Sequence, residues 1–163
     1  MIRLVCLYIY KINNEDDKRE SKEKNYNRND NPIKIFLNTS GGHVYETLAV
    51  VGAIQASKTP VYTIATGSVM SGGFIIFVSS HKRLCYKYTT FLYHGIHAWN
   101  VGTAPMLKIE IDEVNREQEI INDIITNKTK ITKKMLEKHN DESKDWYIGV
   151  QDALKLKIVD EIL

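Results

Sequence analysis

Short apolar runs of strand type alternate with helical patterns along most of this chain, and this alternation limits the possible folds more than any other feature. The strand-like run 33–37 is followed by apolar residues at helical spacing over 44–54, and a second strand-like run occupies 61–65. Thr59 ends the intervening helix, because it precedes a proline and is therefore disfavoured in helical geometry. Strands that alternate with helices predict βαβ units with mostly parallel strands, so the expected fold class is α/β.

The rest of the chain continues this alternation. The run 74–78 is apolar throughout, and its pattern fits a buried helix and a buried strand equally well. A proline is tolerated in the first turn of a helix, so a long helix is expected from Pro105 to about residue 126. The remaining expected elements are strands at 83–86 and 90–93 and short helices that start at Thr132 and Val150.

Length, charge and cysteine content set further limits. The 163 residues fit a single domain over 1–163. The 22 Lys and Arg against 20 Asp and Glu give a net charge of +2, which argues against a strongly basic nucleic-acid binder. No segment approaches the ~18–20 apolar residues of a membrane-spanning helix, so no membrane partner is expected. Cys6 and Cys85 are too few for a disulfide framework, which is compatible with a reducing cytoplasm.

The N-terminal part differs from the remainder. The apolar run 4–10 is a poor signal peptide, because it is too short and no small-residue cleavage site follows it. A core strand or the stub of a core helix is expected there instead. Of the 21 positions in 11–31, 12 are charged and 6 are asparagine. Such a segment buries too little apolar surface to offset its loss of conformational entropy, so a polar, flexible loop is predicted over 11–31.

Two glycine pairs, 41–42 and 72–73, each lie between a strand-like run and a helical pattern. Turns of this kind direct backbone N–H groups into a crevice, where they suit a phosphate or a developing oxyanion. Neither turn has a phosphate-loop pattern, and each pair is also explained as a simple tight turn. Ser71 precedes the second pair, as a nucleophile does in a strand-to-helix elbow, although a helix-capping serine fits the same position.

A serine nucleophile needs a base, and the chain has five histidines. His94 ends the apolar run 91–93, which is where sites form in open α/β sheets. Spacing alone selects neither this histidine nor the acid that would orient it. The cysteines are isolated, and the spacing of His94 and His97 is a weak metal signature, so no metal site is expected.

Five segments, in order, resemble the motifs of the Clp protease proteolytic subunit, a family of serine peptidases. The run N-T-S-G-G-H-V resembles N-S/T-P-G-G-x-V, and G-S-V-M-S-G-G resembles the G-x-A-A-S-M-G-A motif around the family's nucleophile. The segments that carry the resemblance are 35–44, 67–73, 82–85 with 91–94, 144–147 with 152–153, and 158–162. Together they extend over about residues 33–163.

The resemblance implies a catalytic triad of Ser71, His94 and Asp145, in which the serine attacks the scissile carbonyl and the histidine transfers its proton. It also implies that the N–H groups of Gly42 and Gly72 form the oxyanion hole. The implied fold is a crotonase-like spiral of βαβ units with a protruding handle helix over about 105–126.

The family assembles as heptameric rings that stack into a tetradecamer chamber, in which unfolded polypeptide delivered by an AAA+ unfoldase is cut. We therefore expect a homo-oligomer in the cytoplasm, or in the matrix or stroma of an organelle. No cofactor is expected in this chain, because ATP is used by the partner unfoldase. We also expect a lone handle helix to expose Ile121, Ile124 and Ile125, and ring-to-ring packing to bury them.

The chain departs from the family pattern at several positions. Ser40 stands where the family has proline, Gly72 replaces a methionine, and 95–102 is bulkier than the family's glycine-rich substrate strand. We also expect the N-terminal axial loops and first strand to be missing, which leaves coupling to the unfoldase open. Three alternatives remain: an impaired scaffold subunit that assembles with an active paralogue, a crotonase-fold enzyme acting on coenzyme A thioesters, and a Ser–Lys peptidase that does not use His94.

Overall fold

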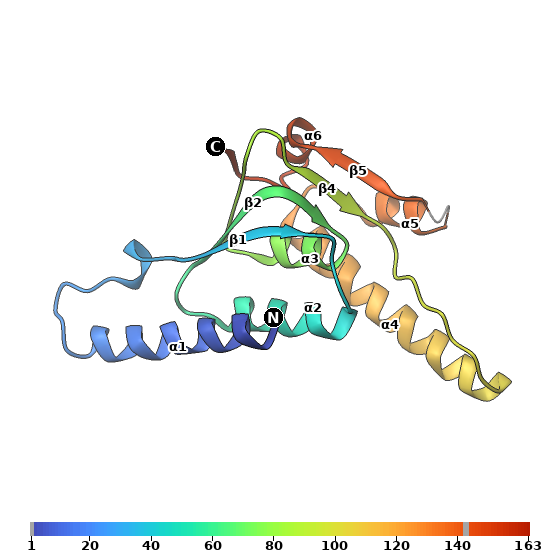
Figure 1. Ribbon diagram of the computed structural model, residues 1–163, viewed down its shortest axis with the longest axis horizontal. Helices are drawn as coiled ribbons and strands as arrows, with labels where there is room; N and C mark the ends of the chain where they lie inside the picture. Colours follow the sequence, from blue (N-terminus) through green and yellow to red (C-terminus); the bar gives the residue numbers. More distant parts are fainter. Residues whose placement is uncertain (1, 142–143) are drawn as a thin grey trace.

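A six-stranded sheet with helices packed along one side forms the body of the protein (Figure 1). The computed structural model describes residues 2–141 and 144–163. The elements in chain order are α1 (Ile2–Glu20), the 3-10 turn η1 (Arg28–Asp30), β1 (Ile33–Thr39), α2 (Val44–Ala56), β2 (Val61–Met70), α3 (Gly72–Ser79), β3 (Lys82–Cys85), β4 (Thr90–Tyr93), α4 (Ala104–Lys128), α5 (Lys133–Asp141), β5 (Trp146–Gly149), α6 (Val150–Lys155) and β6 (Glu161–Ile162). The predicted α/β class is therefore confirmed.

Strand β2 organises the sheet because it is long enough to pair with three other strands. It runs parallel to β1 along one edge. Along its other edge it pairs first with β3 and then, further on, with β4, both in parallel. Strand β5 is antiparallel to β4, and β6 is parallel to β3. Thr39 pairs with Val69, and Leu92 pairs with Met70, so β1, β2 and β4 end at the same edge of the sheet. The segments that follow these three strands are thereby brought together.

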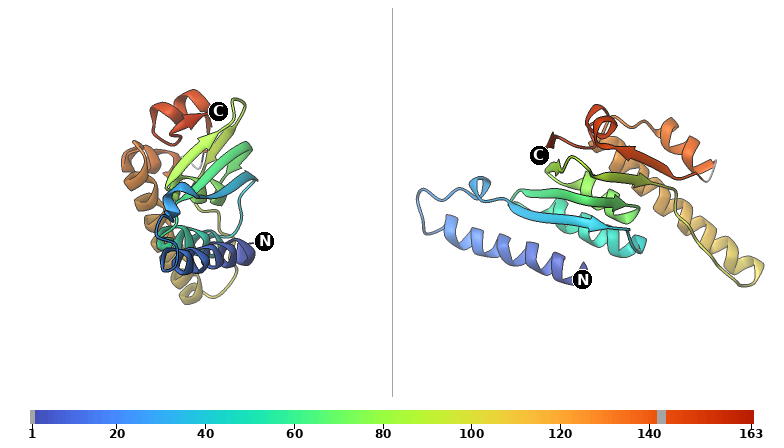
Figure 2. Two further views of the ribbon diagram at one scale, coloured as in Figure 1. Left: turned by 90° about the vertical axis from the view of Figure 1, so that its left-hand side faces the viewer. Right: turned by 45° about the horizontal axis from the view of Figure 1, so that its top comes forward.

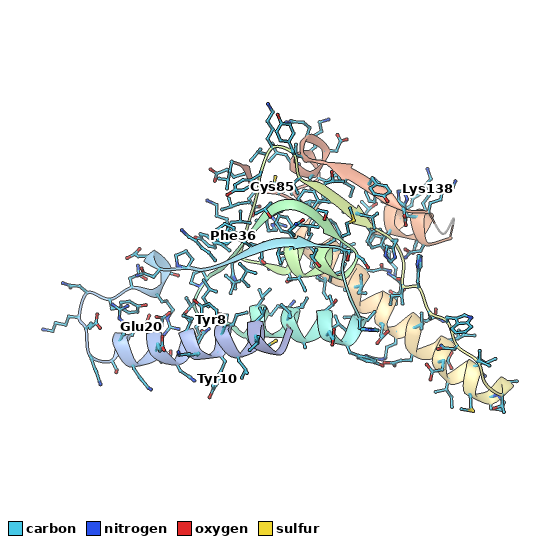
Figure 3. The ribbon with its side chains drawn as sticks, viewed as in Figure 1. Tyr8, Tyr10, Glu20, Phe36, Cys85 and Lys138 are labelled. Atoms are coloured by element: carbon cyan, nitrogen blue, oxygen red, sulfur yellow. The ribbon has the colours of Figure 1, made fainter. Side chains whose placement is uncertain are left out.

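Helices α1, α2, α3 and α4 pack against one another in that order on one side of the sheet (Figure 2). The opposite side is open, and Phe36 on β1 points toward it with an exposed ring (Figure 3). Strand β1 alternates exposed and covered side chains, as a strand with one open face does. Helix α3 is buried on nearly all sides by Phe74, Ile75, Phe77 and Val78, so the ambiguous run 74–78 is a helix.

The sheet and helices enclose two hydrophobic cores. The larger core joins the sheet to α3 and to the second half of α4, and it holds the edge-to-face ring pairs of Phe74 with Phe91 and with Tyr93. Cys85 is fully buried in it. The smaller core lies between α1, α2 and the first residues of β1 and β2, and its buried side chains are Ile9, Ile33, Val50, Ile54 and Val61. The apolar run 4–10 therefore belongs to a core helix rather than a strand.

The prediction of an irregular loop over 11–31 is wrong for its first half, because α1 continues through Glu20. This part of the helix has no apolar stripe, and polar contacts attach it to the rest of the protein instead. Asn13 Oδ1 accepts the backbone N–H groups of Lys58 and Thr59 at 2.8 and 3.1 Å. Arg28, which is only 7% exposed, donates to Asp17 at 2.6 Å and pairs with Glu20. The buried Arg28 is therefore paired with two carboxylates of α1, while most of the other charged residues of this segment are exposed, as predicted.

The predicted long helix is confirmed as α4, which extends away from the body of the protein (Figure 1). Ile121 and Ile125 are buried in the larger core, and Ile124 packs against it. The expectation that a lone helix exposes these three residues is wrong, because the second half of α4 lies on its own chain. The exposed apolar side chains are on the projecting half: Met106, Ile109 and Ile111. Neither α4 nor any other helix in the described residues is long and apolar enough to cross a membrane.

Candidate active site

The turn after β1 lies directly against Ser71. Gly41 has a φ of +111°, a region that residues with a side chain rarely adopt. A Cβ atom added at Gly41 would lie 2.7 Å from Ser71 Cβ, so only glycine allows this approach. The turn is held from within by Thr39, whose Oγ1 accepts the Gly41 N–H at 3.1 Å. Glycine is therefore required here for both backbone conformation and space.

Ser71 connects the end of β2 to the start of α3 in a strained conformation. Its φ of 52° and ψ of −125° are unfavourable for a residue with a side chain. The Ser71 N–H donates to Leu92 of β4 at 3.0 Å, and the Ser71 carbonyl accepts the N–H of Phe74 at 2.9 Å. Strand β4 and helix α3 thus fix the backbone on both sides of the serine. A strained serine between a strand and a helix is the geometry of a nucleophile elbow.

The two glycine turns meet beside Ser71. A Cβ atom at Gly72 would lie 2.3 Å from Thr47 Oγ1 and 3.4 Å from the amide nitrogen of Gly42. The backbones of the two predicted oxyanion donors are therefore in close contact, although they come from turns thirty positions apart in the chain. Thr47 is itself buried in α2, which leaves no room for a side chain at position 72. The observed packing explains why glycine stands at that position.

A pocket of about 260 Å³ opens at this point. Four of the five predicted site residues line it, and three apolar side chains, from α2, α3 and α4, complete part of its wall. The predicted residues in the lining are Gly42, Ser71, Gly72 and His94, and the apolar residues are Val44, Ile75 and Ile121. Two further histidines, His43 and His97, also line the pocket. Both belong to the five histidines that were candidates for the base, from which the family resemblance selected His94. Their closeness follows from the meeting of the segments after β1 and β4.

His94, the candidate base, lines the same pocket as the glycine turns. His94 directly follows β4, and its ring stacks on that of His97 with a centroid distance of 4.4 Å. His94 Nδ1 lies 2.5 Å from the carbonyl oxygen of Gly95, which accepts a hydrogen bond when that nitrogen carries the proton. Within the part of the chain that the structure describes, no hydrogen bond joins Ser71 Oγ, His94 and Asp145. The three residues are therefore not in triad alignment in this structure.

Asp145 is nevertheless close to His94 in the register of the sheet. Tyr93 of β4 is paired with Trp146 of β5, and the two strands are antiparallel. One further step along each strand takes the chains to His94 and Asp145, which are thus opposite one another just beyond the ladder. Opposing residues of an antiparallel pair have Cβ atoms roughly 4.5–5.5 Å apart where the ladder continues. Asp145 is exposed, whereas Tyr93, the residue before His94, is buried.

The described residues contain no group of three or more His, Cys, Asp or Glu side chains that could hold a metal ion. The chemistry available at the pocket is that of a hydroxyl beside a helix N-terminus, two glycine amides and imidazole rings. Such a set suits nucleophilic attack on a carbonyl followed by stabilisation of the oxyanion.

Comparison with known proteins shows the family to which the chain belongs. Residues 24–163 match the sequence profile of the Clp protease family. The ATP-dependent Clp protease proteolytic subunit 3 of Rhizobium meliloti is 32% identical over 136 residues, which are 82% of this chain and 69% of that protein. The ATP-dependent Clp protease proteolytic subunit of Deinococcus radiodurans is 27% identical over 133 residues, 80% of this chain and 64% of that protein.

A solved structure has the same fold. A mutant of ClpP1 from Listeria monocytogenes superposes with a TM-score of 0.72 at 26% identity, covering 94% of this chain and 84% of that one. Fold and pocket together define an α/β protein of the crotonase-like, ClpP type, as predicted. The chain belongs to the Clp protease family, whose members are serine peptidases.

Proposed function

We propose that this chain is the subunit of a Clp-type serine endopeptidase that hydrolyses peptide bonds of unfolded proteins. The observation that carries the proposal is the strained Ser71 at the start of α3, packed against Gly41 and sharing one pocket with His94. A strained backbone that displays a hydroxyl next to an imidazole has no evident structural purpose, because a capping serine needs no positive φ.

The mechanism assigns one role to each predicted residue. Ser71 Oγ attacks the scissile carbonyl carbon, and His94 accepts the hydroxyl proton and then delivers it to the leaving amine. The N–H groups of Gly42 and Gly72 donate to the developing oxyanion. Water hydrolyses the resulting ester by the same steps. Asp145 orients the imidazole, which requires His94 Nδ1 to leave the Gly95 carbonyl and turn toward the opposite strand.

We further propose that the chain works as a homo-oligomer of heptameric rings stacked into a tetradecamer, and that an AAA+ unfoldase supplies unfolded polypeptide at the expense of ATP. Apolar side chains gather on the projecting half of α4 and on the segment before it, where a monomer leaves them in water. They are Met106, Ile109 and Ile111 with Trp99 and Val101. Exposed apolar groups of this kind mark surfaces that another subunit covers.

Replacement of the nucleophile is the test of the proposed activity. Ser71→Ala should reduce hydrolysis of fluorogenic peptides by at least ~10³-fold, as loss of a triad serine does, and should abolish labelling by a fluorophosphonate. Ser68→Ala is the matched control, since Ser68 lies on β2 three residues before Ser71, donates a hydrogen bond to Asn38 Oδ1 and does not line the pocket. Equal labelling of the Ser71→Ala protein would exclude Ser71 as the nucleophile.

A catalytically impaired scaffold subunit is the second candidate, and one observation favours it. His94 Nδ1 is engaged by its neighbour's carbonyl instead of by Asp145. Mass photometry of this chain, alone and mixed with an active paralogue, separates the two candidates. A ring of this chain alone that turns over peptide supports the endopeptidase, whereas peptide turnover only in the mixed ring supports the scaffold.

A further inference from the structure

Four polar side chains meet beside the turn that follows β4 and carries His94. Tyr93 and its partners come from β4, α4 and α5, and three of them are amides: Gln118, Asn122 and Asn140. The Tyr93 hydroxyl donates to Asn140 Oδ1 at 2.9 Å. Tyr93 is only 1% exposed, and burial raises its pKa, so the hydroxyl keeps the proton that it donates. The cluster is thus a fully protonated, neutral set of groups next to the residue that follows Tyr93, His94.

Gln118 contacts the chain on both sides of His94. Its Oε1 accepts the backbone N–H of Ile96 at 2.9 Å. Its Nε2 donates to the Tyr93 hydroxyl at 3.2 Å and to Asn122 Oδ1 at 3.0 Å. A single amide from α4 therefore fixes the residue before the candidate base and the second residue after it. The planar amide group offers an acceptor and a donor at once, which neither an apolar nor a charged side chain does.

The intervening residue is held against the same cluster. A Cβ atom at Gly95 would lie 2.9 Å from Asn140 Oδ1 and 3.5 Å from Gln118 Oε1. The backbone at position 95 therefore packs directly against the side-chain amides of Asn140 and Gln118. Beyond it, His97 follows the anchored Ile96 and stacks on the His94 ring. Fixing the Ile96 N–H consequently positions both the backbone of His94 and the ring that packs on its imidazole.

Helix α4 does not depend on this amide for its own attachment. Ile121 and Ile125, in the following turn, are buried in the larger core and hold the helix to the sheet by apolar contact. Gln118 is only partly buried and reaches across to the turn after β4. Its hydrogen bonds therefore contribute little to the packing of α4 and mainly fix the conformation of that turn.

We propose that Gln118 is a positioning residue for His94, holding the turn 93–96 so that the imidazole is presented to Ser71. This inference rests on the proposed serine peptidase function. Gln118 touches no reacting atom and acts only through the backbone around the base. A displacement of about 1 Å in a catalytic group can lower a rate by roughly 10²-fold, so loss of this anchor is large enough to measure.

The test compares three variants of this chain. Gln118→Met keeps the length of the side chain and removes all its hydrogen bonds. Gln118→Glu keeps an acceptor for the Ile96 N–H and loses the amide donor. Gln151→Met is the control, because Gln151 is an exposed glutamine on α6, away from the pocket. For each protein the rate of fluorophosphonate labelling, kcat and KM for a peptide, the thermal midpoint and amide exchange over 93–97 are measured.

The proposal expects Gln118→Met to slow labelling and lower kcat by roughly 10- to 100-fold, with KM little changed. Exchange over 93–97 should accelerate, and the thermal midpoint should match that of Gln151→Met. Gln118→Glu should restore most of the labelling rate, because it restores the Ile96 bond. A merely structural glutamine would instead lower the midpoint and leave the rate of the folded enzyme unchanged.

Two results would overturn the inference. One is unchanged exchange over 93–97 in Gln118→Met, which would mean that the anchor is not made in solution. The other is faster exchange with undiminished labelling, which would mean that the turn does not place the base. Failure of the proposed function itself is distinguishable, because in that case the unmodified chain would not be labelled either.

Discussion

The two sides of the candidate pocket are built by different means. One side, the nucleophile wall, consists of Gly41, Gly42, Ser71 and Gly72. An added Cβ atom would lie 2.7 Å from Ser71 Cβ at Gly41 and 2.3 Å from Thr47 Oγ1 at Gly72, so two of its positions have no room for a side chain. The other side, the base wall, consists of the segment 94–97, which is placed by hydrogen bonds and ring stacking and lies next to Asp145 in the register of the sheet. The nucleophile wall is formed in the single chain, whereas the base wall lacks the contact between His94 and Asp145.

The contrast separates the part of the candidate site that the single chain packs by itself from the part that it leaves unaligned. Backbone packing between β2, α3 and the turn after β1 leaves Ser71 one conformation. The chain beyond His97 leads into a segment where Trp99 is 90% exposed. Under the proposed mechanism, alignment of the base is therefore left to assembly or to substrate binding.

The largest expected effect comes from breaking the base wall. Asp145→Asn should lower kcat for a peptide by about 10⁴-fold, because an amide favours the wrong imidazole tautomer, as in other serine peptidases. Thermal stability should not change, since Asp145 is exposed. Peptide hydrolysis and a thermal melt measure the two effects. Asp152→Asn, an exposed aspartate that pairs with Lys155, is the control. A loss of less than tenfold would remove Asp145 from the triad.

A smaller effect is expected from breaking the nucleophile wall. Gly41→Ala should slow fluorophosphonate labelling by roughly 10²-fold, because the new methyl group would lie 2.7 Å from Ser71 Cβ and displace the serine. The strained φ should also lower the free energy of unfolding by about 1–3 kcal/mol. Gly52→Ala in α2 is the control, with nothing within 4 Å of its added Cβ, and should be neutral or stabilising. Labelling of Gly41→Ala at the control rate would show that the wall is not rigid.

The smallest effect should come from a site outside both walls. Asp160 Oδ1 lies 2.6 Å from Arg83 Nη2, and Asp160 Oδ2 accepts the Arg83 backbone N–H at 2.8 Å. Partial burial raises the pKa of Asp160, but the hydrogen bonds from Arg83 outweigh it and leave that pKa below its usual value of 3.8. Because the folded-state pKa is lowered, this stabilisation is complete above the unfolded-state pKa and is lost as the pH falls through the folded one.

Asp160→Asn should therefore lower the free energy of unfolding at neutral pH by roughly 1–2 kcal/mol and flatten its decline below about pH 4. Urea unfolding across that pH range is the measurement. The labelling rate at neutral pH should be unaffected, which separates loss of stability from loss of alignment. A large drop in labelling would mean that the geometry of both walls depends on the overall stability of the protein. The labelling rates of the other variants would then not separate one wall from the other.

Much of the fold was predictable because apolar periodicity follows burial. The strands before and after α2, the extent of α4 and the short α6 agree with their patterns. Periodicity could not distinguish helix from strand for α3, since it is buried on nearly all sides. The last half of α1 was missed because Asn13 and Arg28 hold it by polar contacts, which leave no periodic signature.

The candidate site divides in the same way. The glycine turns and Ser71 were recognisable because strand-to-helix turns have a local pattern. His94 and Asp145 were selected by family resemblance, and their opposition across β4 and β5 depends on a register that no local pattern encodes. Gln118 carries no signal at all in the sequence, because a lone amide has no characteristic spacing. The role proposed for it became visible only from its contacts.

The burial of Cys85 has a practical consequence for chemical probes. Its side chain is fully enclosed in the sheet, and desolvation raises its pKa to about 11, so the reactive thiolate is scarce near neutral pH (Figure 3). Cys6, on α1, is partly accessible. An alkylating reagent applied to the native chain therefore modifies one sulfur and spares the other. Reaction of the Cys85 thiol therefore reports unfolding of the centre of the sheet.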